Sequence, residues 1–549
     1  MFKPNVEQQK VINCDASKIV VVAGAGSGKT ASLVHRVNRL VNDGENPESI
    51  LVLTFTRAAA FEMRERYVAI TNNKINIPEF KTFHAFCYAL ISNDVHVLKA
   101  IGYKNVPSII ENDEDKKYKQ IAKVKSGTKL SDKKLATGEG LSLKESREYK
   151  IYKKILRQLI CDANLITFDD LFAKVCDLFK ADDPSIMKYK NRYKHLIIDE
   201  FQDTDPKQWE FAQSIPDCNI CVIGDALQSL YSFRGADSEL IKSLTDSPEW
   251  VKINLSYNYR SGINIVNFAN ANTLYAAGKP YRNIMQASNK FEGQVDISYL
   301  DMRKKNMYNH SSLQSIECMY LEQLKSNPLP GTTALLCRSN AEVAAVCNTL
   351  SDIGVSYTTA GTNSDKLHYV RCITDNDYMI NWVATLLTSA SYASYLKLLK
   401  LRNSSEDGIQ NSTTQWFYKH IATPPMRERM DRVFQLRTVL NDKSITPVQR
   451  IIDCLTILDV DYLVDYDQTF ESIKDAIDFI REVIQKEENK ECSIHVGTIH
   501  SSKGLEYDNV VLFGVNDSPF KLQSEENFNV YYVGITRAKK TLKIFKYEE

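Results

Sequence analysis

The chain has 549 residues, of which 43% are hydrophobic and 25% are charged, a composition typical of a globular protein with several domains. Its 69 Lys and Arg nearly balance its 68 Asp and Glu, so net charge gives no argument for a nucleic-acid partner and any such surface has to be local. The start of the chain lacks signal-peptide features, and no apolar run is long enough to span a bilayer. Together with twelve scattered cysteines that lack zinc-site spacing, this predicts a reducing, cytoplasmic location without a membrane partner.

A glycine-rich loop follows the first predicted strand, which is the β-branched run 19–22. Apolar residues at helical spacing come after the loop, and Gly44 is placed to end that helix. Strand, glycine loop, Gly-Lys-Thr and helix are the context of a P-loop, whose backbone N–H groups surround phosphate oxygens. The lysine reaches the β- and γ-phosphates and the threonine hydroxyl ligates Mg²⁺. The predicted nucleotide-binding residues are Ala23, Gly24, Ala25, Gly26, Ser27, Gly28, Lys29 and Thr30.

Two further segments accompany the second predicted strand, 50–54. Gln8 lies upstream of the P-loop, and its amide is suited to pair with the donor and acceptor of an adenine. The strand itself continues into Phe55 and Thr56, and His84 follows in the segment Lys-Thr-Phe-His-Ala-Phe.

Acidic and polar residues follow two more apolar strands. Strand 195–198 ends at Asp199 and Glu200, and strand 220–223 ends at a loop that contains Gln228. The carboxyl ends of parallel strands meet at one edge of an α/β sheet, so these side chains are expected beside the P-loop. We predict that Asp199 holds Mg²⁺ and that Glu200 orients and deprotonates the attacking water.

A second α/β unit is predicted in the later part of the chain. Its expected elements are strands 333–337, 355–358, 494–498, 509–513 and 541–545, and a helix over 341–352. The strand–helix alternation stops twice, at about 93–158 and 365–490, where the pattern becomes helical. In the first of these segments, residues 123–143 are expected to include a solvated loop.

Several segments together resemble the UvrD/Rep/PcrA branch of superfamily 1 helicases. The matching stretches are T-F-T-R-A-A-A-F-E-M (54–63), D-E-F-Q-D-T (199–204), G-D-A-L-Q-S-L-Y-S-F-R-G-A (224–236), N-Y-R-S (258–261), I-H-S-S-K-G-L-E-Y (499–507) and Y-V-G-I-T-R-A (532–538). The resemblance implies an α/β fold with two RecA-like P-loop NTPase cores, each with an inserted, mainly helical subdomain. The expected boundaries are 1–92 and 159–255 for the first core, 93–158 for its insertion, 256–364 and 491–549 for the second core, and 365–490 for its insertion.

The resemblance also implies roles for individual residues around bound ATP. Gln228, Arg260 and Arg537 are expected at the γ-phosphate, with Arg260 as a candidate arginine finger. Tyr259 is expected against the adenine, and Glu506 near the ribose or triphosphate. The catalytic set is therefore predicted to be Lys29, Glu200, Gln228, Arg260 and Arg537.

A second implied set of residues contacts DNA. Aromatic side chains stack on bases regardless of sequence, which suits Tyr231 and Phe233. The complete predicted DNA-binding set is Phe55, Thr56, His84, Tyr231, Phe233 and His500. The implied activity is that of an ATP-dependent DNA helicase or translocase on single-stranded or 3′-tailed DNA, moving in the 3′-to-5′ direction.

The insertion at 113–157 carries 14 Lys and Arg against 7 Asp and Glu. A phosphate-contacting surface and a merely solvated helical surface both fit this excess. The chain also departs from the family pattern, since Ala31 replaces an arginine that packs on the base in many relatives, and a C-terminal tail is expected to be missing.

A second hypothesis retains the NTPase activity but assigns the protein a different role. Compact members of this branch also serve as DNA-responsive subunits of nuclease-containing antiphage complexes, such as the helicase-like subunit of Gabija systems. In that case the partner is a nuclease subunit and processive unwinding is not required.

Overall fold

The computed structural model describes residues 3–71, 77–110, 112–138, 140–230, 238–273, 284–301, 313–359, 493–516 and 524–548, with isolated positions at 431, 435, 438, 439, 453, 520 and 522. The chain divides into two compact units, Met1–His310 with Ser502–Glu549 and Ser311–Ser501. Apart from its isolated positions, the predicted second helical insertion, 365–490, lies outside the described residues. In the described part, no helix has the length and apolar character needed to cross a membrane.

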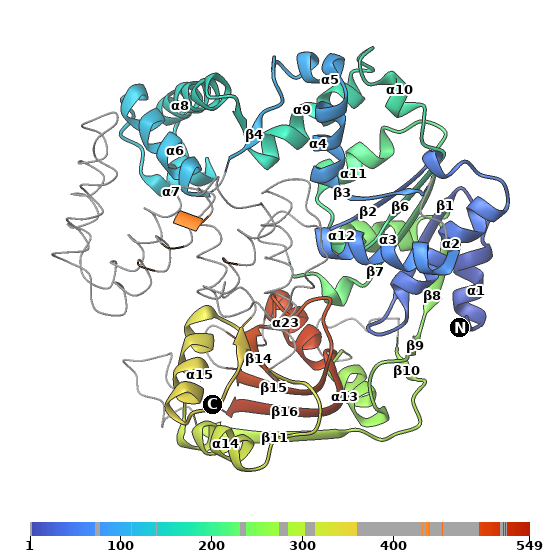
Figure 1. Ribbon diagram of the computed structural model, residues 1–549, viewed down its shortest axis with the longest axis vertical. Helices are drawn as coiled ribbons and strands as arrows, with labels where there is room; N and C mark the ends of the chain where they lie inside the picture. Colours follow the sequence, from blue (N-terminus) through green and yellow to red (C-terminus); the bar gives the residue numbers. More distant parts are fainter. Residues whose placement is uncertain are drawn as a thin grey trace. The chain divides into compact units, whose positions relative to one another are not determined.

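A six-stranded sheet organises the first part of unit 1 (Figure 1). Its order is β3-β2-β6-β7-β1-β8, and all neighbouring pairs are parallel. The strands are β1 (Lys18–Ala23), β2 (Ile50–Thr54), β3 (Glu79–Thr82), β6 (His195–Ile198), β7 (Asn219–Gly224) and β8 (Val251–Leu255). The four core strands expected in this region are therefore confirmed, because their near-continuous apolar runs suit strands that are buried on both faces.

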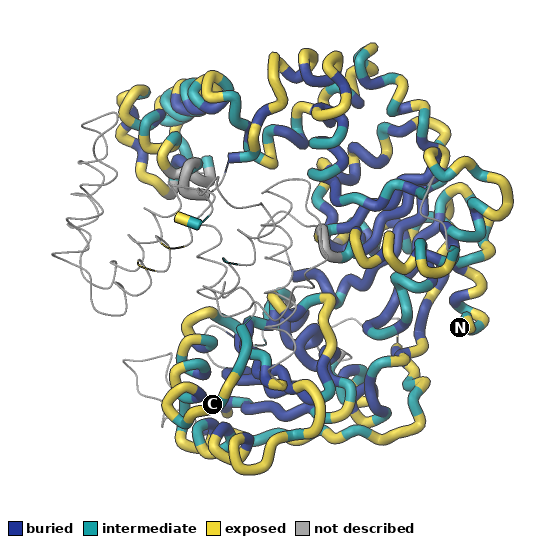
Figure 2. Tube along the Cα trace, in the orientation of Figure 1, coloured by how far each residue is buried: buried dark blue, intermediate teal, exposed yellow. Residues whose placement is uncertain are grey.

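Successive residues of these strands alternate between two apolar cores, as the pleat of a strand requires. Val21 and Val52 belong to one core, whereas Val20 and Leu51 belong to the other. Helices α1 (Val6–Asn13), α2 (Lys29–Asn42) and α3 (Arg57–Thr71) contribute to the first core. Helices α4 (Phe83–Asn93), α5 (Val95–Ala100), α9 (Phe168–Lys180), α11 (Pro206–Gln213) and α12 (Ser238–Asp246) contribute to the second. Strands β1, β2, β6 and β7 are accordingly buried along most of their length, whereas the edge strands β3 and β8 are only partly buried (Figure 2).

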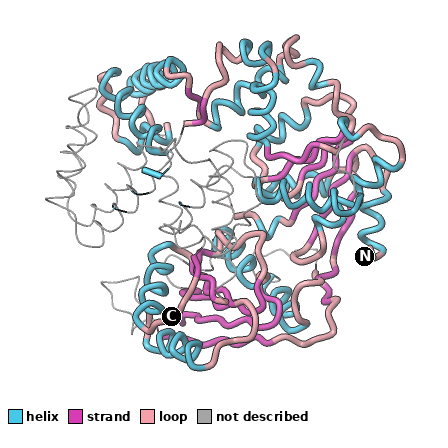
Figure 3. Tube along the Cα trace, viewed as in Figure 1, coloured by secondary structure: helices cyan, strands magenta, loops and turns pink. Residues whose placement is uncertain are grey.

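A small helical subdomain interrupts this core (Figure 3). It contains α6 (Asn112–Ser126), α7 (Asp132–Thr137) and α8 (Leu143–Asp162), and the short parallel pair β4 (Ser108–Ile109) and β5 (Leu165–Ile166) joins it to the core. An apolar cluster of its own includes Ala122, Tyr152 and Leu156. Residues 123–143, where a solvated loop was expected, also contain helix α7, because Ser131 accepts a hydrogen bond from Lys134 N and caps its start.

Unit 1 also holds a second parallel arrangement, in which β16 pairs with both β11 and β15. Its elements are α13 (Ile263–Thr273), β11 (Gln294–Asp301), β15 (Tyr507–Val515), α23 (Glu525–Ile535) and β16 (Ala538–Glu548). The short pair β9 (Tyr257–Asn258) and β10 (Gln286–Ala287) follows β8. The remaining short elements of this unit are α10 (Met187–Lys190) and the 3₁₀ turns Pro47–Ser49, Phe201–Asp203 and Ala226–Gln228.

Unit 2 contains three parallel strands and two helices among its described residues. These are α14 (Ser315–Ser326), β12 (Thr333–Cys337), α15 (Asn340–Asp352), β13 (Thr358–Thr359) and β14 (Ile494–Thr498). The strand expected at 355–358 begins only at Thr358. The reason is that Gly354 N and Val355 N donate to Ser351 O and Leu350 O, so these residues still close the end of α15. Both units thus have the parallel α/β character expected of RecA-like cores.

Candidate nucleotide-binding site

The P-loop connects β1 directly to α2. Gly26 and Gly28 have φ angles of +65° and +78°, in the left-handed region that favours glycine. Gly28 is the N-cap of α2 and offers no side chain to its first N–H groups, which suits a phosphate acceptor. Lys29 and Thr30 are the first two residues of α2, and each is partly exposed. The loop therefore has the geometry of an anion-binding helix start.

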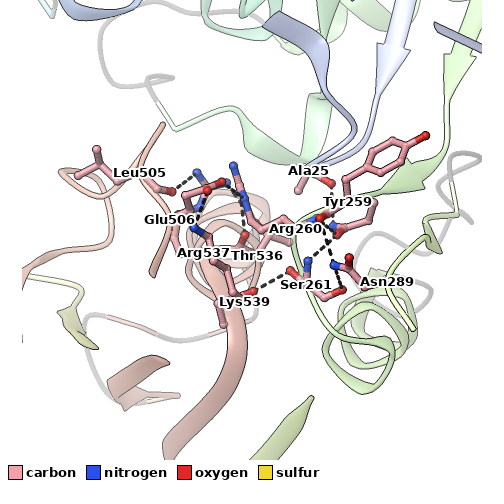
Figure 4. A network of polar contacts seen from close by, with 12 residues as sticks. Ala25, Tyr259, Arg260, Ser261, Asn289, Leu505, Glu506, Thr536, Arg537 and Lys539 are labelled. Carbon is pink, nitrogen blue, oxygen red and sulfur yellow. Dashed lines mark hydrogen bonds and ion pairs between the residues drawn. The ribbon is translucent and has the colours of Figure 1, made fainter. Parts of the chain in front are cut away.

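The segment after β8 is fastened to the P-loop (Figure 4). Asn258 Nδ2 donates to Ala25 O over 2.8 Å, and Tyr259 N donates to Gly26 O over 2.9 Å. A Cβ atom on Gly26 would lie 2.7 Å from Arg260 Cβ, so only glycine allows this approach. The N-Y-R-S segment is therefore held against the loop that is expected to bind phosphate.

Gln8 is buried and hydrogen-bonded within the protein. Its Nε2 donates to Ser27 O over 3.0 Å, and its Oε1 accepts from Asn5 N in a capping box. Asn5 Nδ2 in turn donates to the Tyr259 hydroxyl over 2.6 Å, while Tyr259 remains 42% exposed. Tyr259 is thus accessible for an adenine ring, whereas Gln8 is buried against the P-loop.

Two carboxylates follow β6, at the edge of the sheet where the P-loop lies. Asp199 is buried and accepts from Glu200 N over 2.9 Å, and Glu200 has a left-handed φ of +51°. Such strain in a non-glycine residue is concentrated at functional sites. Lys29 Nζ is 3.8 Å from Glu200 Oε2.

The two carboxylates have different electrostatic environments. Burial and the adjacent Glu200 raise the pKa of Asp199. Burial also opposes ionisation of Glu200, but the charges of Lys29 and Lys503 outweigh it and lower the pKa of Glu200. Glu200 is consequently the stably ionised member of the pair. A buried carboxylate such as Asp199 is stabilised in its charged form by a nearby cation, and this fits a magnesium ligand.

Gln202 links Glu200 to the loop after β7, and the sequence analysis did not single it out. Its side chain is buried, with Nε2 donating to Glu200 Oε2 over 2.5 Å and Oε1 accepting from Asp225 N over 2.9 Å. Gly224 makes room for it, because a Cβ atom there would lie 2.5 Å from Gln202 Oε1. The signal available in the sequence was the D-E-x-Q spacing, which places Gln202 two residues after Glu200 in the same loop.

Gln228 joins this network to the end of α23. Its Nε2 donates to Asp225 Oδ2 over 2.8 Å, and its Oε1 accepts from Arg537 Nη2 over 3.2 Å. Arg537 is buried and also donates to Leu505 O over 3.1 Å. Burial and the charge of Arg260 lower the pKa of Arg537 to about 9, which still leaves the guanidinium protonated at neutral pH.

Arg260 is tied to Glu506 (Figure 4). Its Nε donates to Glu506 Oε2 over 2.8 Å, and its Nη1 donates to Thr536 O over 2.9 Å. Glu506 also pairs with Lys539 over 2.7 Å, so it is held by two cations. Burial opposes ionisation of Glu506, but Lys539 and Arg260 lower its pKa. Both predicted γ-phosphate arginines therefore lie in one polar network with Gln228 and Glu506.

Comparison with known proteins assigns the chain to a family. A family model described as the UvrD/REP helicase N-terminal domain matches residues 4–249, and the UvrD-like helicase C-terminal domain matches residues 397–549. The chain belongs to the UvrD/Rep helicase family.

Individual similar proteins are consistent with this family assignment. "ATP-dependent DNA helicase PcrA" of Staphylococcus epidermidis is 26% identical over 614 aligned residues, covering 98% of this chain and 83% of the relative. The proteins of the same name from Bacillus subtilis and Staphylococcus aureus are 27% and 23% identical, each covering 98% of this chain and 82% of the relative.

The structure describes some of the DNA-contact residues expected from the UvrD/Rep resemblance but not all of them. Phe55 and Thr56 follow β2, and Thr56 Oγ1 accepts from Ala59 N over 3.1 Å at the start of α3. His84 lies on α4 with its ring 5.3 Å from that of Phe168. Tyr231 and Phe233 lie outside the described residues, and His500 follows β14 in unit 2.

Other polar residues join this UvrD/Rep site without having been predicted. Lys503 Nζ pairs with Asp203 and donates to Gln228 O over 2.7 Å, and Asn529 Nδ2 donates to Ser229 O over 3.3 Å. Lys503 and Asp203 lie within quoted motifs, and Asn529 lies three residues before one, but the sequence indicated no partner for any of them. The unpredicted members of the network are Gln202, Asp203, Asp225, Lys503 and Asn529.

Proposed function

We propose that this UvrD/Rep family protein is an ATP-dependent DNA helicase or translocase that couples ATP hydrolysis to movement along single-stranded DNA. The observation that carries the proposal is the contact between Gln228 and Arg537, next to the Lys29–Glu200 pair. This arrangement brings the candidate phosphate-binding lysine, water-activating carboxylate, polar sensor and arginine into one network. The relatives named as ATP-dependent DNA helicases support the same activity.

In this proposal the P-loop and the start of α2 bind the phosphates of ATP. Lys29 contacts the β- and γ-phosphates, and backbone N–H groups from Gly24 to Thr30 surround the phosphate oxygens. The Thr30 hydroxyl and the buried Asp199 carboxylate fit Mg²⁺, which supplies positive charge at the phosphates when bound. Tyr259 packs its exposed ring against the base.

Hydrolysis then depends on groups that act at the γ-phosphate. Glu200 orients the attacking water and accepts its proton, and its low pKa keeps it ionised for this task. Arg537 and Arg260 stabilise the charge that develops as the γ-phosphoryl group leaves. Arg260 has to exchange Glu506 for phosphate, so nucleotide binding is expected to rearrange the Arg260–Glu506–Lys539 cluster.

Movement along DNA is proposed to depend on the same two arginines. As Arg260 and Arg537 exchange protein partners for phosphate, the protein would bind the DNA strand tightly and loosely in turn. The 3′-to-5′ direction rests on the family resemblance, as does the contact of DNA with Phe55, Thr56, His84, Tyr231, Phe233 and His500.

Helix α8 supplies a candidate surface for the DNA backbone. Lys144, Arg147, Lys150 and Lys154 are all exposed and recur at three- and four-residue intervals, so they lie on one helix face. The nearby acid Glu145 pairs instead with Lys134 on α7 over 2.6 Å. The exposed face of α8 therefore presents cations whose charge is not cancelled by the acids in its first half.

One experiment separates the proposed activity from the alternative of an NTPase subunit in a nuclease-containing complex. ATP hydrolysis is measured with no DNA, single-stranded DNA and duplex DNA, and unwinding is measured on 3′-tailed, 5′-tailed and blunt duplexes. We expect hydrolysis stimulated by single-stranded DNA and unwinding of the 3′-tailed duplex. Stimulated hydrolysis without unwinding of any duplex would favour the alternative, and no hydrolysis under any condition would refute both.

A further inference from the structure

The first turn of α1 meets the segment after β8 at two points. Glu7 accepts two hydrogen bonds from Ser256, one from the backbone N over 2.7 Å and one from Oγ over 2.7 Å. Asn5, the N-cap of α1, donates through Nδ2 to the hydroxyl of Tyr259 over 2.6 Å. These partners lie 249 and 254 positions apart in the sequence. The start of α1 is therefore fastened along the chain that leads from β8 to Tyr259.

The contact from Asn5 concerns the ring of Tyr259, because the backbone of this residue is already held. Tyr259 N donates to Gly26 O over 2.9 Å, and Tyr259 O accepts from Asn289 Nδ2 over 3.0 Å. The ring itself is exposed, and a tyrosine side chain has several staggered rotamers about its Cα–Cβ bond. The hydrogen bond from Asn5 to the hydroxyl selects one of them.

Asn5 uses both ends of its side-chain amide. Oδ1 accepts from Gln8 N over 2.7 Å and caps α1, while Nδ2 holds the tyrosine hydroxyl. Glu7 keeps this capped turn against Ser256, and hydrogen bonds to a carboxylate are stronger than those to a neutral acceptor. Support therefore passes from the end of β8 through Glu7 and Asn5 to the tyrosine ring.

Stability alone gives little reason for the contact between Asn5 and Tyr259. The two groups are exposed, and a hydrogen bond between exposed groups replaces bonds to water with little net gain. A ring that is held in place before binding, in contrast, has less conformational entropy to lose when a ligand packs against it. Ligand binding therefore explains the contact better than folding does.

We infer that Asn5 and Glu7 are positioning residues for nucleotide binding, which orient the Tyr259 ring to pack against the base. This inference rests on the proposed function, since it concerns the base side of the same site. The two residues act through the tyrosine ring and not through the phosphates. A ligand with an aromatic base should therefore depend on them, whereas a triphosphate without a base should not.

The test measures the binding of a non-hydrolysable ATP analogue and of inorganic triphosphate, both with Mg²⁺, to the full chain by isothermal titration calorimetry. The variants are Asn5→Ser, Tyr259→Phe and the double variant. Serine keeps an N-cap but ends one bond short of the donor atom, and phenylalanine keeps the ring without the hydroxyl. The matched control is Asn46→Ser, because Asn46 caps the turn Pro47–Ser49, which precedes β2 at the sheet edge opposite the P-loop.

The expected pattern separates the base from the phosphates. We expect Asn5→Ser and Tyr259→Phe each to weaken binding of the ATP analogue by about fivefold or more, since affinity falls with the fraction of molecules whose ring is correctly placed. Affinity for triphosphate should stay within about twofold of the wild type, because it does not depend on that fraction. The double variant should lose no more than the worse single variant, because both changes remove the same contact. Asn46→Ser should bind both ligands as the wild type does.

Glu7 is tested by a conservative exchange. Glu7→Gln can still accept from Ser256 N and can donate to Ser256 Oγ, whereas Glu7→Ala loses both contacts. Both changes remove a negative charge that favours the start of a helix. We expect Glu7→Ala to weaken binding of the ATP analogue and Glu7→Gln to bind it nearly as the wild type does. Asp183→Ala is the matched control, because Asp183 accepts from Ser185 N and Ser185 Oγ in the same way, and it should keep the wild-type affinity.

The results that would overturn the inference are equally specific. They are wild-type affinity for the ATP analogue in folded Asn5→Ser or Tyr259→Phe, an equal loss of affinity for triphosphate, and fully additive losses in the double variant. Equal weakening by Glu7→Gln and Glu7→Ala would show that Glu7 acts through helix charge and not through Ser256. A wild-type protein that binds neither ligand would instead refute the proposed function, so the two failures are distinguishable.

Discussion

Arg537 Nη2 lies 3.2 Å from Gln228 Oε1, although the two residues are 309 positions apart in the sequence. The contact joins the end of α23 to the loop after β7, and both side chains are buried. Gln228 cannot move toward a phosphate without altering the partner of Arg537. Binding of a γ-phosphate by this pair would therefore change contacts at the end of α23 and in the loop after β7 together.

Replacement of Gln228 by Ala should impair hydrolysis more than binding. The change removes the acceptor for Arg537 and the donor to Asp225 Oδ2. Loss of one preorganised polar contact at a developing charge costs about 10²-fold in kcat. We expect a loss approaching that size with a small change in KM, measured by steady-state hydrolysis with single-stranded DNA. An unchanged kcat would remove Gln228 from the hydrolytic network.

Lys29→Ala and Glu200→Gln should both abolish DNA-stimulated hydrolysis, for different reasons. Lys29→Ala removes the phosphate-binding ammonium, so binding of a fluorescent ATP analogue should weaken. Glu200→Gln keeps the shape of the side chain and can retain the contact with Gln202, so binding should persist while hydrolysis falls. Circular dichroism checks that both variants keep the fold. Full hydrolysis by Glu200→Gln would show that Glu200 is not the base.

Gln202→Leu should reduce both stability and activity. The leucine fills similar space but leaves Asp225 N without its side-chain acceptor, and an unsatisfied buried donor costs about 1–3 kcal/mol. Glu200 also loses the donor that holds its Oε2. We expect a lower midpoint in urea and a lower kcat. Lys207 is exposed on α11, and Lys207→Gln serves as the control for a substitution in unit 1.

The sequence predicted the parts of the site that belong to continuous motifs. The P-loop, Asp199 and Glu200 each follow an apolar strand directly, so local pattern and sheet geometry determine where they lie. Four core strands of the first sheet were found for the same reason, since a strand buried on both faces is a short apolar run.

The sequence could not predict which motif residues contact one another. Gln202 and Lys503 lie within recognised segments, but their partners Asp225 and Asp203 come from other loops, and loop conformation decides such pairs. The ion pairs of Glu506 with Arg260 and Lys539 were likewise not predicted. The start of β13 was misplaced because the end of α15 uses residues that read as extended. The side-chain pairs depend on tertiary contacts that no local pattern encodes.

His84 should make the stability of the protein sensitive to mild acid. Burial lowers the pKa of His84 below its ordinary 6.5, although Asp169 and Asp205 oppose this. Between pH 6.5 and the lower folded pKa, the unfolded chain binds more protons, so the free energy of unfolding falls as pH falls. His84→Gln should lose less thermal stability than the wild type between about pH 7.5 and about pH 5.5, as read by calorimetry.

The exposed His96 provides the control for this effect. His96→Gln makes the same replacement at an exposed position and controls for the substitution itself. Equal pH dependence in the wild type and His84→Gln would show that the burial of His84 does not contribute.

The exposed cations of α8 should contribute to DNA affinity through phosphate contacts. In Arg147→Gln/Lys150→Gln/Lys154→Gln, affinity for a tailed duplex should fall and its salt dependence should become shallower, by about 0.9 in slope for each lost contact with B-DNA. The matched control is Lys119→Gln/Lys123→Gln on α6, whose ammonium groups already pair with Asp115 and Asp132. Fluorescence anisotropy at several salt concentrations gives both slopes. Because α8 belongs to the helical subdomain, which has its own apolar cluster, KM for ATP without DNA should stay at the wild-type value in both variants. An unchanged salt slope in the α8 variant would assign this face to solvation alone.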